Sequence, residues 1–191
     1  MQGVDNSTSL SCAILGGGCF WCLEAIYQHI QGIESVESGY AGGKLLYPDY
    51  DAVCTGETGH AEVVKILFVD SQIDYRVLLE IFFASHDPTT LNRQGNDMGS
   101  QYRSVIFATS PLQLDIAQST KNMLGQTHKF AGPIVTEIYY LDRRDLGHLF
   151  WPAESIHSNY YRDNQSRNPY CSLVIQPKVE KIRDTFSQYW R

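Results

Sequence analysis

The sequence predicts an α+β fold: a two-layer sandwich with a ferredoxin-like (split βαβ) core, a mixed sheet, and an appended C-terminal coil and helix. The first observation behind this prediction is the order of the patterned segments, which is strand, helix, strand and then again strand, helix, strand. The second is the composition: 191 residues, of which 43% are hydrophobic and 19% are charged, are typical of one globular unit. We therefore expect a single domain over residues 1–191, with 162–191 as a tail.

The first strand-helix-strand unit begins close to the N-terminus. Residues 12–15 form a short apolar run that ends at three glycines, 16–18. The apolar residues that follow recur at helical spacing: Leu23, Ile26, Tyr27 and Ile30. Residues 35–40 then have the pattern of a strand.

The second unit begins with a strongly apolar strand over 61–69. Asp74 is suited to cap the helix that follows, which we expect to end before Asp87-Pro88. After a polar loop over 89–101, residues 103–109 are predicted to form a strand.

Two further elements are predicted before the tail. Ser110 to Gln113 has the pattern of a capping box with proline at the first helical position, so a helix follows it. Residues 134–141 are expected to form a strand, and 152–161 a short helix.

In the tail, Asn168-Pro169 and Gln176-Pro177 bracket Cys171, which we expect on a mobile coil. The final helix has a modest apolar stripe that favours a simple packing role: Val179, Ile182, Phe186 and Tyr189.

The charge and the N-terminus exclude several functional classes. The net charge is -6 and the charged residues are interspersed, so neither nucleic acid nor an anionic membrane is an expected partner. Met1 to Leu10 lacks the features of a secretory signal, and no apolar run approaches 18 residues. We expect a cytoplasmic protein whose five cysteines are reduced and reactive or incidental, not structural staples.

Cys19 is the first candidate for chemistry. It follows the three glycines at the predicted start of a helix, where unpaired N–H groups and the helix dipole stabilise an anion. We expect a lowered pKa and a nucleophilic thiolate, in preference to a cysteine that merely packs. Phe20 and Trp21 beside it are suited to a small apolar pocket for a methyl or thioether group. The alternative, that both rings simply cover the helix end, remains open.

Glu62 is the second candidate. Alternation along the strand puts it on the same face as Val64, Ile66 and Phe68, an apolar row in which burial would raise its pKa and keep it protonated. A solvated position at the strand end is the alternative. His60 is a possible base or metal ligand, although a lone histidine is more often structural.

Two further features are less specific. Cys19 and Cys22 have the spacing of a redox dithiol or of half a zinc site, but no second unit with ligand spacing accompanies them, so no metal is expected. The polar loop over 92–103 has the length and composition of a binding loop, and equally those of a solvated loop.

Five motifs occur together in the chain: Gly18-Cys19-Phe20-Trp21, Gly56-Glu57-Thr58-Gly59-His60-Ala61-Glu62, His86-Asp87-Pro88-Thr89, Arg93-Gln94-Gly95-Asn96-Asp97 and Gln101-Tyr102-Arg103-Ser104. In this order they closely resemble the A-type peptide methionine sulfoxide reductases, and the resemblance runs from about Ala13 to Lys178. It implies reduction of the S epimer of methionine sulfoxide, free or in proteins, with thioredoxin as the final reductant, no bound cofactor, and repair of oxidised proteins.

The resemblance also implies roles for individual residues. Cys19 would be the nucleophile, Glu62 the acid that protonates the sulfoxide oxygen, and Cys171 the resolving cysteine carried by the tail of a single catalytic domain. The remaining implied site residues hold or orient the substrate: Phe20 and Trp21 at its methyl group, Tyr50 and Tyr102 at its oxygen, and Asp97 as an organiser of the site.

One departure from the family pattern concerns Cys22, which stands where many relatives have glycine. It leaves open which thiol resolves the sulfenic acid; we expect Cys171, because a helical i,i+3 pair forms a disulfide only with strain. Two other classes remain as alternatives: a hydrolase that uses Cys19 with His60, and a disulfide exchanger that uses Cys19 with Cys22.

Overall fold

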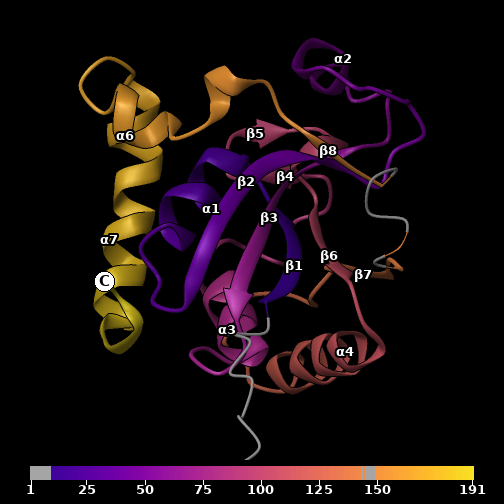
Figure 1. Ribbon diagram of the computed structural model, residues 1–191, viewed down its shortest axis with the longest axis vertical. Coiled ribbons are helices and arrows are strands. Elements are labelled where there is room, and N and C mark those ends of the chain that lie inside the picture. Colours follow the sequence, from indigo (N-terminus) through magenta and orange to yellow (C-terminus); the bar gives the residue numbers. More distant parts are fainter. Residues whose placement is uncertain (1–9, 143, 145–148) are drawn as a thin grey trace, which may run out of the picture.

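A six-stranded mixed sheet runs through the protein in the order β7-β6-β1-β3-β2-β8 (Figure 1). The computed structural model describes residues 10–142, 144 and 149–191. The strands of this sheet are β1 (Leu10–Gly17), β2 (Ile33–Ala41), β3 (Ala61–Val69), β6 (Ser104–Ala108), β7 (Glu137–Tyr140) and β8 (Phe150–Pro152). Only β6 and β7 are parallel neighbours among these strands. The expected α+β class with a mixed sheet is confirmed.

The longer helices are α1 (Phe20–Tyr27), α3 (Tyr75–Ser85), α4 (Pro111–Gly125) and α7 (Gln176–Thr185). Shorter helical segments are α2 (Tyr50–Cys54), η1 (Ser100–Tyr102), η3 (Ser155–His157), α6 (Tyr160–Asn164), η4 (Cys171–Ile175) and η5 (Ser187–Tyr189). A separate hairpin pairs β4 (Arg93–Gln94) with β5 (Asp97–Met98). None of the described helices is long and apolar enough to cross a membrane.

Local sequence signals account for the starts of α3 and α4. The Asp74 carboxylate accepts the Arg76 amide at 2.7 Å, and the Ser110 hydroxyl accepts the Gln113 amide at 3.2 Å. Each cap satisfies one of the amides that a helix leaves unpaired in its first turn. Both predicted helix starts are confirmed, as is the strand over 61–69.

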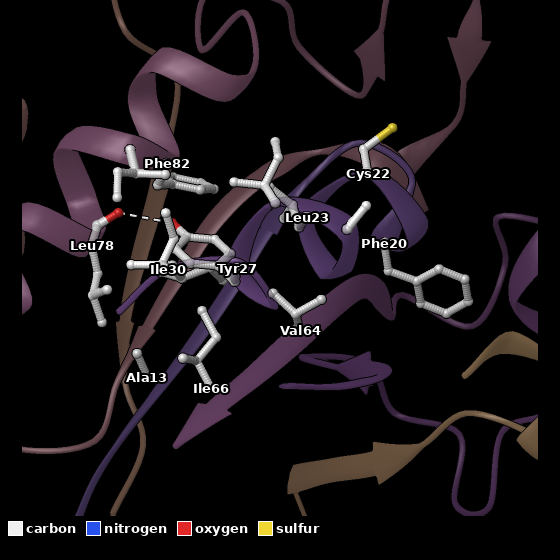
Figure 2. Close-up of a cluster of buried hydrophobic side chains, with 14 of the residues drawn as sticks. Ala13, Phe20, Cys22, Leu23, Tyr27, Ile30, Val64, Ile66, Leu78 and Phe82 are labelled. Atoms are coloured by element: carbon white, nitrogen blue, oxygen red, sulfur yellow. Dashed lines mark hydrogen bonds between the residues drawn. The ribbon is translucent and has the colours of Figure 1, made fainter. Parts of the chain in front are cut away.

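The main core lies between the sheet and the helices α1, α3 and α7. Alternate β3 residues, from Val64 to Phe68, point into this core, whereas Ala61 and Val63 join a smaller cluster on the other face of the sheet. Figure 2 shows the Tyr27 ring of α1 beside α3, and its hydroxyl donates to the Leu78 carbonyl at 2.8 Å. Because α1 is buried almost throughout, the residues at its start are held firmly.

The helix expected over 152–161 is wrong. Residues 150–152 instead form the edge strand β8 against β2, where the missing N–H of Pro152 is tolerated at the strand end. Asn159, in the left-handed conformation with φ 56°, then separates η3 from α6. The strand expected over 134–141 is shorter than predicted, and α2, η1 and the β4–β5 hairpin were not predicted.

The expectation of a mobile coil around Cys171 is also wrong. Cys171 is buried and begins a π-helical turn that continues directly into α7. Pro177 lies at the start of α7, where its missing N–H does not break the helix. The Arg191 guanidinium donates to the carbonyls of Gln28 and Ile33, so the end of the tail is fixed beside α1 (Figure 1).

Candidate active site

The three glycines bring Cys19 to the cap position of α1. Gly18 has φ +92°, and a Cβ there would lie 2.7 Å from the Gln94 side chain. A Cβ on Gly16 would lie 2.8 Å from the Glu62 carbonyl. The glycines therefore permit both the turn and the close approach of β3 and the 94–97 hairpin to Cys19.

The expectation that the Cys19 pKa is lowered is wrong. Cys19 is only 6% exposed, and this burial raises the pKa of its thiol well above the ordinary value. The hydrogen bond with Cys22 and the charge of Glu62 raise it further, while the Trp21 amide at the helix start lowers it by less. Loss of water outweighs the helix terminus, because a thiolate loses more from desolvation than one amide returns.

Cys22 is the more acidic of the two thiols. Its pKa is lowered, first by the hydrogen bond from Cys19 and then, against burial, by Lys178 and Tyr170. The Lys178 ammonium lies 3.8 Å from the Cys22 sulfur. Sequence reasoning assigned α7 a packing role and missed Lys178; the only available signal was the Cys-x-x-Cys spacing.

Glu62 occupies the buried row that the strand pattern predicts. Its side chain is 1% exposed, and burial raises its pKa to about 8. The Phe20 amide, one of the unpaired amides at the start of α1, donates to Glu62 Oε2 at 3.0 Å. The carboxyl is therefore protonated at neutral pH, beside the residue that follows Cys19.

Tyr50 and Tyr102 lie on short helical segments beside this carboxyl. Burial raises the pKa of both hydroxyls, and the charge of Glu62 contributes to both shifts. The Tyr50 amide donates to Glu154 at 2.7 Å, which fixes the start of α2. Both phenols remain protonated and can donate hydrogen bonds.

Asp97 connects this region to the tail. Its carboxylate accepts the Tyr170 hydroxyl at 2.7 Å. Cys171 follows directly, fully buried, and its pKa is raised by burial and then by the charge of Cys22. The tail thus brings a third thiol close to the Cys19–Cys22 pair.

Aromatic rings line the start of α1. Phe20 is fully buried and Trp21 half-buried. The Trp21 indole lies flat against Tyr160, with ring centroids 3.7 Å apart and planes 6° apart, and its N–H donates to His157 at 3.3 Å. The His157 ring lies 5.3 Å from that of Phe20. Sequence reasoning missed His157 and Tyr160 because it treated their segment as one helix.

His60 does not face Cys19. Its Nδ1 accepts a hydrogen bond from the Gly43 amide at 3.1 Å, and its Nε2 is 2.8 Å from the Leu45 carbonyl. The His60 ring therefore holds the loop after β2 in place by hydrogen bonds. The hydrolase alternative therefore lacks its base. Over the described part of the chain, no group of three or more His, Cys, Asp or Glu side chains could hold a metal ion.

Comparison with known proteins decides the family. The family model described as "Peptide methionine sulfoxide reductase" matches residues 11–190. The chain belongs to this family. It is 54% identical over 179 residues to the Peptide methionine sulfoxide reductase MsrA of Ralstonia nicotianae, covering 94% of this chain and 92% of that protein. The Deinococcus radiodurans MsrA is 46% identical over 190 residues, covering 100% of this chain and 89% of the relative.

Solved structures agree with this membership. Methionine sulfoxide reductase A of Corynebacterium diphtheriae superimposes with a TM-score of 0.78 at 31% identity, over 86% of this chain and 80% of that one. Reduced Mxr1 of Saccharomyces cerevisiae gives 0.73 at 31% identity, over 85% and 90% of the two chains. Mxr1 has also been solved in complex with Trx2. The present chain is thus a thiol-dependent oxidoreductase, a peptide-methionine (S)-S-oxide reductase.

Proposed function

We propose that Cys19 takes the oxygen from the sulfur of methionine sulfoxide. The observation that carries this assignment is the pairing of a buried thiol with a carboxyl that is protonated at neutral pH, Glu62. A sulfoxide is a poor electrophile until its oxygen is protonated or strongly hydrogen-bonded. The Cys19 sulfur then attacks the substrate sulfur and forms an S–S bond. The hydroxyl group moves from the substrate sulfur to Cys19 as this S–S bond breaks, which releases methionine and leaves Cys19 as a sulfenic acid.

Two proton movements accompany the attack. Glu62 gives its proton to the sulfoxide oxygen, to which the Tyr50 and Tyr102 hydroxyls donate hydrogen bonds. The Cys22 sulfur loses its own proton more readily and accepts the hydrogen bond of the Cys19 thiol, so it can take the proton of Cys19 as the Cys19 sulfur attacks. The site is organised around this step by Asp97, through its contact with the tail.

The substrate methyl group binds against Phe20 and Trp21. Support comes from the apolar surface of the two rings, which lie 6.1 Å apart between centroids, and from the partial exposure of Trp21. The sulfoxide oxygen and the methyl group thereby occupy distinct places, which is what selection of one sulfoxide epimer requires.

Cys22 relays the disulfide to Cys171: in this proposal Cys22 reacts first with the sulfenic acid, the step expected above of Cys171, and Cys171 completes resolution by freeing Cys19. Cys19 lies at the cap of α1 with ψ 126°, outside the regular helix, which relaxes the strain expected for a disulfide with Cys22. The Cys22 sulfur condenses with the sulfenic acid and water leaves; the Cys171 thiol then displaces Cys19 from that disulfide. Cys19, Cys22 and Cys171 are free thiols here, as this order of exchange requires.

An external dithiol, thioredoxin, then reduces the Cys22–Cys171 disulfide. The related Mxr1 has been solved with Trx2, a thioredoxin, which supports this partner. Methionine-sulfoxide-containing proteins are the proposed substrates, and no bound cofactor takes part. A cytoplasmic location is part of the same proposal, since a reducing compartment supplies the dithiol that the cycle needs.

Two finer points of architecture belong to the same proposal. The strand order β6-β1-β3-β2, with β3 antiparallel to both neighbours, supports the split βαβ class for the central strands. We also treat the chain as a single catalytic domain over 1–191 with 162–191 as its tail, supported by the burial of Cys171 and Ile182 in the main core.

The decisive test is dithiol-driven reduction of the two separated methionine sulfoxide epimers. We expect methionine from the S epimer only, and only when dithiol or reduced thioredoxin is supplied. Ester or amide cleavage without reductant would support a hydrolase, and reduction of insulin disulfides without sulfoxide would support a disulfide exchanger.

A further inference from the structure

A second buried carboxylate, Glu24, lies on α1 outside the reaction centre. Its side chain is 1% exposed, and its Oε1 accepts the amide N–H of Asn159 at 3.1 Å. Burial raises the pKa of Glu24, and the amides of Asn159 and Tyr160 oppose that rise. Within the described residues, Oε2 is buried without a hydrogen-bond partner. The Glu24 carboxylate thus holds the backbone just before α6 by a hydrogen bond.

The backbone that Glu24 holds is in the left-handed conformation at Asn159. Asn159 has φ 56° and ψ 28°, a conformation that costs a non-glycine residue free energy unless its surroundings hold it. Gln28, one helical turn after Glu24 and on the same face of α1, donates to the Asn159 side chain at 2.9 Å. Two side chains, one on α1 and one at its C-cap, therefore hold Asn159 in this conformation.

The turn determines where the next ring lies. Tyr160 is the first residue of α6, a five-residue helix that buries none of its own residues. Its ring nevertheless lies flat on the Trp21 indole, 3.7 Å away between centroids. Tyr160 packs against the main core, and its hydroxyl accepts the Asn168 side-chain amide at 2.9 Å. The hydrogen-bonded turn at Asn159 fixes the backbone from which the Tyr160 ring reaches Trp21.

We propose that Glu24 is a positioning residue for sulfoxide reduction: it holds the Asn159 turn, which fixes Tyr160 against Trp21 and so sets the wall of the methyl pocket. The inference rests on the proposed role of Trp21. Glu24 does not touch the reacting atoms, so its loss should weaken substrate binding and leave the chemical step almost intact.

The test compares Glu24→Leu, which removes the acceptor at similar size, with Glu24→Gln, which keeps an acceptor oxygen. Glu24→Leu should raise KM for a methionine sulfoxide peptide by about 10-fold, with kcat within about threefold. Glu24→Gln should keep KM within about threefold, yet lower Tm, since its amide N–H₂ lies buried without an acceptor. Stability and positioning are thereby separated.

A double-mutant cycle tests the route. If Glu24 acts through the ring, Glu24→Leu in a Tyr160→Ala background should raise KM by less than about twofold further. If the fold-changes in KM of the two single variants multiply in the double variant, the proposal is overturned. A Glu24→Leu protein with lowered Tm and unchanged KM would also overturn it. Trp21→Ala is measured in parallel. If KM rises in Trp21→Ala but not in Glu24→Leu, only the Glu24 inference is wrong. If KM is unchanged in Trp21→Ala, both the pocket assignment and the Glu24 inference are wrong.

A second pair of variants keeps the test informative if Glu24→Leu fails to fold. Asn159→Gly retains access to positive φ, whereas Asn159→Val strains it strongly. Asn159→Val should raise KM by about 10-fold and Asn159→Gly by less than about threefold. Equal KM values in these two variants would overturn the proposal.

Discussion

Replacing Glu62 by glutamine removes the acidic proton of the carboxyl group and keeps the shape of the side chain. The glutamine side chain retains an oxygen to accept the Phe20 amide, which is 3.0 Å from Oε2 in the native protein. It has no acidic proton to give to the sulfoxide. We expect turnover to fall by about 10²–10⁴, the usual contribution of a general acid, or about 3–5 kcal/mol of activation free energy. Substrate binding should change less.

The pH dependence of this variant is equally specific. Because the Glu62 pKa is about 8, the native enzyme holds the donor proton below pH 8 and loses it above, so its rate should fall on the alkaline side. Glu62→Gln has no such proton, so its rate should not show the alkaline fall with an apparent pKa near 8 that the native enzyme shows.

The stability of the native protein should also fall as the pH rises. The pKa of Glu62 is raised from 4.5 to about 8 in the folded protein, so the folded state binds the proton more tightly than the unfolded state. Its contribution is fully present below pH 4.5 and is lost as pH rises through 8, by up to about 5 kcal/mol. Glu62→Gln should therefore lose less stability than the native protein between pH 6 and pH 9.

The assay is the rate of S-epimer reduction and the urea-unfolding free energy, each measured over this pH range. Glu57→Gln, the same substitution at an exposed carboxyl, is the control and should match the native protein. A rate loss of less than about threefold at pH 7, where an acid role costs far more, or an alkaline fall that persists in Glu62→Gln, would refute the acid assignment.

Three further predictions address the pocket and the thiols. Trp21→Ala should raise KM by about 1–3 kcal/mol in free-energy terms through lost contact with the methyl group, and an unchanged KM with a large fall in Tm would show a core role instead. Cys171→Ser should lower the methionine released without reductant from about two molecules per enzyme to about one, leaving a Cys19–Cys22 disulfide in peptide maps; an undiminished yield would contradict the relay. Lys178→Met should raise the pKa of Cys22 and slow its alkylation at pH 7, with Lys181→Met, whose ammonium binds the Ala84 carbonyl, as the unaffected control.

The elements that depend on local geometry were predictable from the sequence. Alternation fixes the face of every residue in a strand, so the burial and raised pKa of Glu62 follow from its place in the row with Val64. Side-chain caps act within three residues, so Asp74 and Ser110 mark their helices correctly.

What failed depends on contacts between distant segments. The pKa of Cys19 was expected to fall because its helix start was considered alone, whereas burial of the folded site reverses the sign. Lys178 approaches Cys22 across 156 residues, and no local pattern encodes that contact. The stacking of Tyr160 on Trp21 likewise follows a left-handed residue, Asn159, for which the helix expected over 152–161 left no place.

The central claim, oxygen transfer to Cys19, is tested most directly by a single turnover without reductant. In a Cys22→Ser, Cys171→Ser double variant no resolving thiol remains, so the sulfenic acid should persist and react with dimedone. We predict about one methionine per enzyme from the S epimer, with one dimedone adduct on Cys19, and neither when Cys19→Ser is added. Methionine formed at the same yield without Cys19, or an adduct on another residue, would contradict the account.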